Sequence, residues 1–248
     1  MATPETSNLP NKKKIWVPLE NNPDVFSHLA SKLGVSSNLD FYDVYSIDDP
    51  ELLAFVPRPV YALLFTCPAD VYYKAREKDD KTVPEYNEAG DKEPVVWFKQ
   101  TIGNACGLIA LLHGLCNGET KQYIQPGSDM EKLLKEAIPL KRQARADLLY
   151  NSEALEVAHK SAAVRGDTVA PNSEDPVGNH YICFVKGKDG HLWELEGGWK
   201  GPLDRGALEP EEDMLSDKAL NLGVKNFLAQ AGGKDLRFSL VAMAPNLN

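Results

Sequence analysis

Hydrophobic residues recur along the chain at two spacings, and these spacings mark out its secondary structure. The most continuous apolar run, VYALLFTC at residues 60–67, is typical of a strand buried on both faces. The run HYICFVKGKDGHLWELEGG predicts a hairpin with its turn at residues 186–190. The expected strands are 41–47, 60–67, 180–185, 191–196 and 236–244.

Apolar residues three and four positions apart predict the helices. Val25, Leu29 and Leu33 share one face of a short amphipathic helix that ends at Gly34. Further helices are expected at 51–56, at 69–80, from Cys106 onward, as a pair within 129–163, and near 215–230. The segments 82–94 and 165–178 are polar and contain Gly and Pro, which indicates loops.

Helices around a mainly antiparallel set of strands predict an α+β protein within the broad α/β class. Residues 1–14 (MATPETSNLPNKKK) read as a disordered N-terminal tail. No polar linker is long enough to divide the remainder, so residues 15–248 are expected to form a single domain.

Charge and composition narrow the possible partners. The 248 residues carry a formal net charge of −9, and the only tight basic cluster is Lys12–Lys14, which argues against nucleic-acid binding. No apolar run is long enough to span a membrane, and the N-terminus lacks the apolar core of a secretory signal. A reduced compartment, the cytoplasm or the nucleus, is therefore expected, and we expect a monomer.

One of the four cysteines has an unusual setting. Cys67 and Cys183 lie in apolar runs, where cysteine is usually a small buried residue. The sequence contains no C-x-x-C pair, so the cysteine spacing does not indicate a metal site. Cys106 instead follows the turn-forming segment TIGNA and begins a helix. The free N–H groups of a helix N-terminus favour the reactive thiolate. An isolated cysteine there is still more often a core residue.

A cysteine nucleophile also needs an oxyanion donor and a base, and the sequence contains candidates for both. Gln100 lies across the turn, where its amide could donate to an oxyanion. The candidate bases are His28, His113, His159, His180 and His191. His180 stands out because it begins a buried strand directly after a polar loop. The returning hairpin strand brings Glu196 roughly opposite His180, with Glu194 on the same face, and spacing alone leaves either acid as its partner.

The segment QTIGNACGLIALLHG resembles the active-site signature of the ubiquitin C-terminal hydrolase family of cysteine peptidases. The resemblance extends over about 230 residues and matches the short members, which have no C-terminal extension. The other similar blocks are WVPLENNPDVF, FYDVYSIDDPELLAFVPRPVYALLF, GNHYICFV, DGHLWELEGGWKGP and LRFSLVAMAP.

The resemblance assigns a role to each candidate. It implies Cys106 as nucleophile, His180 as general base and Gln100 as oxyanion donor. The orienting acid falls on Glu196, where the family commonly has Asp, and the turn at 186–190 looks one residue longer than usual. No metal or cofactor is implied.

The resemblance also implies a papain-like core with a knotted backbone and a crossover loop at residues 158–179 above the active site. The implied activity is hydrolysis of small or flexible adducts after the C-terminal glycine of ubiquitin, with related modifiers as further possible substrates. Implied ubiquitin contacts are Leu19, Glu20 and Asp43. The alternative is a ubiquitin-binding module with weak turnover, because Glu replaces the usual Asp.

Overall fold

The computed structural model describes residues 13–77, 79–172, 178–232 and 237–247. Within them, six strands form one sheet in the order β1-β6-β2-β3-β4-β5, and each neighbouring pair is antiparallel. The strands are β1 (Leu39–Asp43), β2 (Ala62–Pro68), β3 (Asn179–Lys186), β4 (His191–Leu195), β5 (Leu203–Ala207) and β6 (Ser239–Pro245). Every residue of β2 is buried, as its continuous apolar run predicts.

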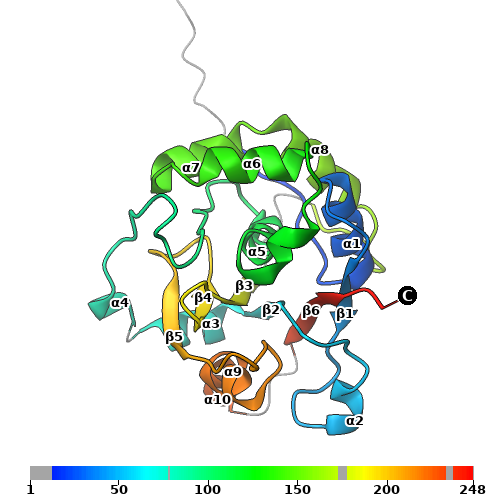
Figure 1. Ribbon diagram of the computed structural model, residues 1–248, viewed down its shortest axis with the longest axis vertical. Helices are drawn as coiled ribbons and strands as arrows, with labels where there is room; N and C mark the ends of the chain where they lie inside the picture. Colours follow the sequence, from blue (N-terminus) through cyan, green and yellow to red (C-terminus); the bar gives the residue numbers. More distant parts are fainter. Residues whose placement is uncertain (1–12, 78, 173–177, 233–236, 248) are drawn as a thin grey trace, which may run out of the picture.

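Helices cover both faces of the sheet, which gives the three layers of an α/β fold (Figure 1). One face is covered by α1 (Pro23–Lys32), α5 (Cys106–Leu115), α6 (Asp129–Ala137), α7 (Arg142–Tyr150) and α8 (Glu153–Ala162). The other carries α3 (Ala69–Arg76), α9 (Asp217–Leu222) and α10 (Val224–Ala231). The remaining short helices are α2 (Pro50–Leu53), α4 (Asp79–Thr82) and the 3-10 helix η1 (Gly118–Tyr123).

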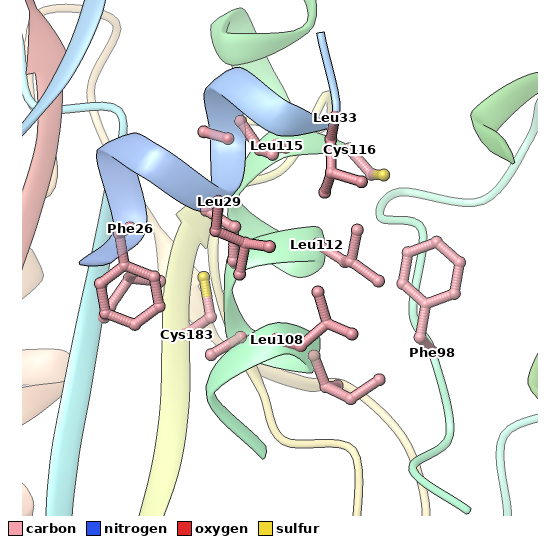
Figure 2. Close-up of a cluster of buried hydrophobic side chains, with 14 of the residues drawn as sticks. Phe26, Leu29, Leu33, Phe98, Leu108, Leu112, Leu115, Cys116 and Cys183 are labelled. Carbon is pink, nitrogen blue, oxygen red and sulfur yellow. The ribbon is translucent and has the colours of Figure 1, made fainter. Parts of the chain in front are cut away.

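Helix α5 lies at the centre of the larger core. Its residues from Gly107 to Leu115 are all buried, because α5 packs on β2 and β3 of the sheet and on the 3-10 helix η1. Figure 2 shows α1 beside α5: Leu33, the residue directly after α1, lies near Leu112 and Cys116, and Cys183 of β3 lies below Leu29. This packing fixes the start of α5, and hence Cys106, against the sheet.

Several expected elements need correction. The segment 129–163 forms three helices rather than two, because Ser152 caps a new helix by accepting from the N–H of Leu155. The helix near 215–230 is likewise two helices that meet at Gly223. The hairpin is confirmed, but a strand after it, β5, was not expected from the sequence.

The folded part of the chain begins nearer the N-terminus than the expected boundary at residue 15. Residues 1–12 lie outside the described residues, but Lys14 belongs to the folded protein. Its ammonium donates to the Tyr150 carbonyl at 2.9 Å and pairs with Glu156 at 2.8 Å. The knotted path stays a prediction. No helix within the described ranges is long and apolar enough to cross a membrane.

Candidate active site

Cys106 is the first residue of α5, as expected, and the half-buried side chain is surrounded by backbone donors. The preceding turn contains Asn104 at φ 59°, a left-handed conformation that asparagine tolerates. The backbone N–H groups of Gly107, Tyr181 and Cys106 favour the thiolate. Burial and the negative charge of Glu196 nevertheless raise the pKa of Cys106 to about 11. The thiol is therefore protonated at neutral pH in this arrangement.

Gln100 is fixed by its backbone beside the end of the hairpin. Its N–H donates to the carbonyl of Gly197 at 2.7 Å, so the segment before α5 is joined to the residues after β4. Its side-chain Nε2 donates to the Ile102 carbonyl at 3.0 Å, which fixes the orientation of the amide. The amide has a second N–H, so an additional acceptor can be bound.

His180 lies near the start of β3, opposite Cys67 of β2. Its imidazole stacks on Tyr72 of α3, with ring centroids 4.4 Å apart and planes at 19°. Burial lowers the pKa of His180 and the positive Arg76 adds to this, while Glu196 acts in the opposite direction. The ring is therefore neutral at pH 7, as a general base must be.

Glu196 is 4% exposed, and both of its oxygens accept hydrogen bonds. Oε2 accepts from the Tyr72 hydroxyl at 2.8 Å, and Oε1 accepts from the Gly198 N–H at 2.8 Å. The hairpin register pairs Leu195 with Cys183, so Glu196 lies two positions short of the place opposite His180 that the sequence suggested. Among the described hydrogen bonds, none joins His180 to Glu196 or to Cys106.

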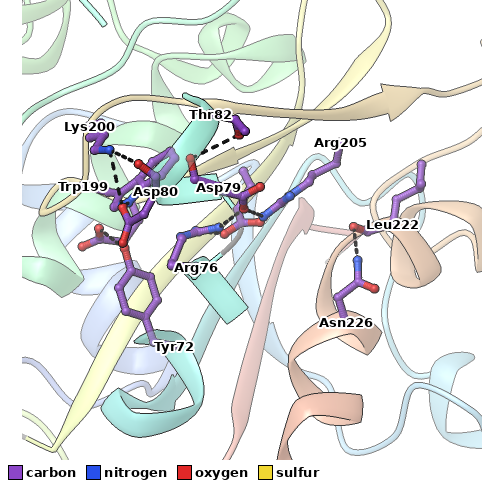
Figure 3. A network of polar contacts seen from close by, with 12 residues as sticks. Tyr72, Arg76, Asp79, Asp80, Thr82, Trp199, Lys200, Arg205, Leu222 and Asn226 are labelled. Carbon is purple, nitrogen blue, oxygen red and sulfur yellow. Dashed lines mark hydrogen bonds and ion pairs between the residues drawn. The ribbon is translucent and has the colours of Figure 1, made fainter. Parts of the chain in front are cut away.

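Glu194 has a different set of partners, which removes it as an alternative orienting acid. It pairs with Phe184, four residues along β3 from His180. One oxygen forms an ion pair with Arg76 and the other pairs with Arg205 at 2.6 Å. Figure 3 shows these two arginines converging with Asp79 between α3 and the strands. Glu194 thus belongs to a buried charge network that fixes α3 on the sheet.

The expected ubiquitin contacts lie in three different settings. Leu19 is 6% exposed and packs against Gly107 in the core, so its side chain is not a surface contact in this structure. Glu20 accepts from the N–H and hydroxyl of Thr168 at 2.9 and 2.5 Å. Asp43 ends β1 and is partly exposed; burial raises its pKa, and the nearby Asp24 adds to the shift.

Glu20 connects the N-terminal segment to the loop after α8. Burial alone would raise its pKa, but the hydrogen bonds from Thr168 and its neighbours lower it. Helix α8 extends to Ala162, so the connection to β3 is shorter than the expected range 158–179. Residues 173–177 of that range lie outside the described residues.

Two buried residues near the site were not assigned from the sequence. His113 accepts from the Phe98 N–H at 2.9 Å and so attaches the segment before the active-site turn to α5. Burial lowers its pKa to about 3, which makes it a neutral structural residue. Tyr72 contacts both His180 and Glu196, and sequence spacing carried no signal for it because Glu196 is 124 residues away.

The described residues contain no group of three or more His, Cys, Asp or Glu side chains arranged to hold a metal ion.

Comparison with known proteins identifies the family. The sequence profile of ubiquitin carboxyl-terminal hydrolase, family 1, matches residues 16–229. Ubiquitin carboxyl-terminal hydrolase YUH1 of Saccharomyces cerevisiae is 32% identical over 237 residues, covering 93% of this chain and 96% of the relative. Ubiquitin carboxyl-terminal hydrolase 3 of Arabidopsis thaliana is 36% identical over 245 residues, covering 98% and 99%.

A solved structure shows the same fold. The Trichinella spiralis UCH37 catalytic domain, bound to ubiquitin vinyl methyl ester, superposes with a TM-score of 0.68 at 20% identity, covering 93% of this chain and 95% of that one. The papain-like fold expected from the resemblance is thereby confirmed. Together with the profile match and the two full-length relatives, it shows that this chain belongs to family 1 of the ubiquitin carboxyl-terminal hydrolases, which are cysteine peptidases.

Proposed function

We propose that this protein hydrolyses the amide or ester bond after the C-terminal glycine of ubiquitin and so releases small or flexible adducts. The observation that supports the proposal is a cysteine at the start of α5, which packs against the strand that carries a buried histidine, with the Gln100 amide held six residues before the cysteine by its bond to the Ile102 carbonyl. The names of the two relatives and the ubiquitin ester bound to the UCH37 domain support ubiquitin as the substrate.

The first half of the reaction forms a thioester. Cys106 gives its proton to His180, and the sulfur attacks the glycine carbonyl carbon. The negative charge that develops on the carbonyl oxygen is stabilised by the second N–H of Gln100 and the N–H of Cys106. The carbonyl then re-forms, the bond to the adduct breaks, and His180 returns the proton to the leaving amine or alkoxide.

The second half releases ubiquitin. His180 removes a proton from water, the resulting hydroxide attacks the thioester carbon, and the Cys106 sulfur leaves and is reprotonated. Glu196 stabilises the imidazolium that forms in each half through its negative charge. Because no hydrogen bond joins Cys106 to His180 in the described structure, the two side chains must approach each other when substrate binds.

The experiment is covalent capture. Ubiquitin with a C-terminal vinyl methyl ester should add one ubiquitin to the wild-type protein, and peptide mapping should place it on Cys106 rather than on the three buried cysteines. Cys106→Ser should not be labelled and should lose hydrolysis, while its affinity for ubiquitin stays near wild type. Activity that survives in Cys106→Ser would show that the nucleophile is assigned wrongly.

The same experiment tests the alternative of a ubiquitin-binding module, which the comparisons do not favour. A binding module would hold ubiquitin without forming the adduct. Three related assignments rest on the sequence alone and are proposed with the function: a monomeric state, a cytoplasmic or nuclear location, and an active-site crossover within residues 158–179.

A further inference from the structure

Tyr72 contacts the general base and the orienting acid at the same time. Its ring stacks on His180, and its hydroxyl donates to Glu196 at 2.8 Å. The side chain is 3% exposed, so neither contact is shared with solvent. Burial and the charge of Glu196 raise the pKa of Tyr72, so the hydroxyl remains a donor at every working pH.

The fold itself brings Tyr72 to this place. Strand β2 ends at Pro68, and α3 begins at the next residue, beside the start of β3. One helical turn then places Tyr72 over His180. One further turn along α3, the Arg76 guanidinium lies 5.1 Å from the Tyr72 ring and is paired with Glu194. The buried charge network therefore fixes the helix that presents Tyr72 (Figure 3).

The glutamate side chain explains why such a partner is needed. A glutamate has one more rotatable bond than an aspartate, so its carboxylate is less well fixed unless other groups bind it. Here the Tyr72 hydroxyl holds one oxygen and the Gly198 N–H holds the other. Each oxygen retains a free lone pair, which leaves room for a further hydrogen bond from His180.

We infer that Tyr72 is a positioning residue of the catalytic centre, which fixes the imidazole plane of His180 through its ring and the carboxylate of Glu196 through its hydroxyl. The inference rests on the proposed function, because it assumes that His180 and Glu196 take part in the hydrolysis.

The test is a double-mutant cycle on hydrolysis of a fluorogenic ubiquitin C-terminal amide. Tyr72→Phe keeps the ring and removes the hydroxyl. We expect kcat to fall by about tenfold, the order expected for one hydrogen bond to a charged group, with KM nearly unchanged. In a Glu196→Ala background the same change should cost less than twofold, because the hydroxyl acts through Glu196.

The pH dependence of kcat/KM separates a positioning role from a merely structural one, because a merely structural role would leave this dependence unchanged. Without the Tyr72 hydroxyl, the Glu196 charge is less compensated and stabilises the protonated His180 more strongly. The pKa of His180 should therefore rise, and the acidic limb of kcat/KM should move to higher pH in Tyr72→Phe.

Tyr86→Phe is the matched control. Its hydroxyl donates to Glu93 at 2.8 Å, the same kind of contact at a different place in the fold. Tyr86→Phe should leave both kcat and the acidic limb unchanged, even if its thermal stability falls as far as that of Tyr72→Phe.

Two results would overturn the inference while the proposed function stands. One is an active wild-type enzyme whose Tyr72→Phe variant has unchanged kcat and acidic limb. The other is a Tyr72→Phe loss that is equally large in the Glu196→Ala background. A wild-type protein that is inactive and not captured by ubiquitin vinyl methyl ester would instead overturn the proposed function.

A second measurement needs no Tyr72 variant. In the wild-type protein the buried Tyr72 hydroxyl proton should exchange slowly with solvent and be visible by proton NMR. The signal should disappear in Glu196→Ala. Its persistence there would show that the hydroxyl has another acceptor and would overturn the inference.

Discussion

The backbone N–H of Tyr181, the residue directly after the proposed base His180, acts on the Cys106 sulfur and favours its thiolate. The nucleophile thus lies against the strand that carries the base, although no hydrogen bond joins the two side chains in the described structure. Backbone donors stabilise the thiolate, yet burial and Glu196 outweigh them and raise the pKa of Cys106 to about 11.

This balance predicts a slowly reacting thiol in the free enzyme. The rate of Cys106 alkylation by iodoacetamide should rise steadily between pH 7 and 10, because the thiolate fraction increases tenfold per pH unit below the pKa. Peptide mapping separates Cys106 from the other three cysteines, and Cys106→Ser provides the background. A rate that levels off below pH 8 would contradict the prediction.

Gln100→Ala should lower kcat by roughly 10²–10³, the usual effect of removing one oxyanion donor. Steady-state hydrolysis of a ubiquitin C-terminal amide measures the effect. Gln143→Ala is a suitable control, because this exposed glutamine on α7 also uses its amide, in a bond to Asp147. A loss of less than about fivefold in Gln100→Ala would remove Gln100 from that role.

Glu196→Gln should reduce kcat strongly, by up to ~10⁴ in the limiting case of a serine triad. Glu196→Asp should perform no better than the wild type, because the shorter side chain would have to give up the Tyr72 hydroxyl or the approach to His180. The kcat values of the two variants check both statements. A Glu196→Asp enzyme that is faster than wild type would contradict the second.

Glu194→Gln should act on stability rather than on the chemical step. The reason is its buried ion pair with Arg76. Removing one partner of a buried ion pair costs about 3–5 kcal/mol. Urea denaturation should show a loss of this order. The control is Glu131→Gln, since Glu131 forms a partly exposed pair with Lys135 and should cost little.

Stability should fall in mild acid because His159, like His113, is buried in its neutral form. Burial lowers its pKa from the ordinary 6.5 to about 4, while its ring donates to the Val17 carbonyl at 2.7 Å. Below pH 6.5 the unfolded chain binds a proton that the folded protein excludes, so stability is full above pH 6.5 and decreases toward pH 4. The loss from His159 is about 3 kcal/mol.

Thermal unfolding between pH 7 and 4.5 measures this loss, and His159→Gln should make the decrease shallower. Substituting His191 should leave it in place, because the hydrogen bond to Asp204 raises the pKa of His191 instead. If the melting temperature of the wild type is the same at pH 7 and 4.5, the prediction that folded His159 stays neutral in this range is wrong.

Local patterns were sufficient for the elements around the site. The start of α5 at Cys106 follows from a turn-rich segment before an apolar helix, and the hairpin follows from alternating strands around a Gly-containing turn. These features depend only on residues that are close together in the sequence. The position of His180 near the start of a strand could be predicted in the same way, because a polar loop directly precedes an apolar run.

The contacts that determine each residue's role depend on distant neighbours, and sequence spacing does not report them. Glu194 and Glu196 differ by two positions, yet one pairs with Arg76 and the other with the Tyr72 hydroxyl. Leu19 and Glu20 are adjacent, yet one lies in the core and the other binds Thr168 of the loop after α8. Tertiary packing alone decides between these outcomes.

The position of β6 has a consequence for synthesis on the ribosome. Residues 239–245 are the last of the six strands to be made, but they lie between β1 and β2. Until they emerge, β1 has no partner in the sheet and β2 presents an open apolar edge, a template for pairing with other chains. The nascent protein must therefore keep these two strand edges apart from other nascent chains until residues 239–245 are made, and loss of this short segment would divide the sheet rather than trim its edge.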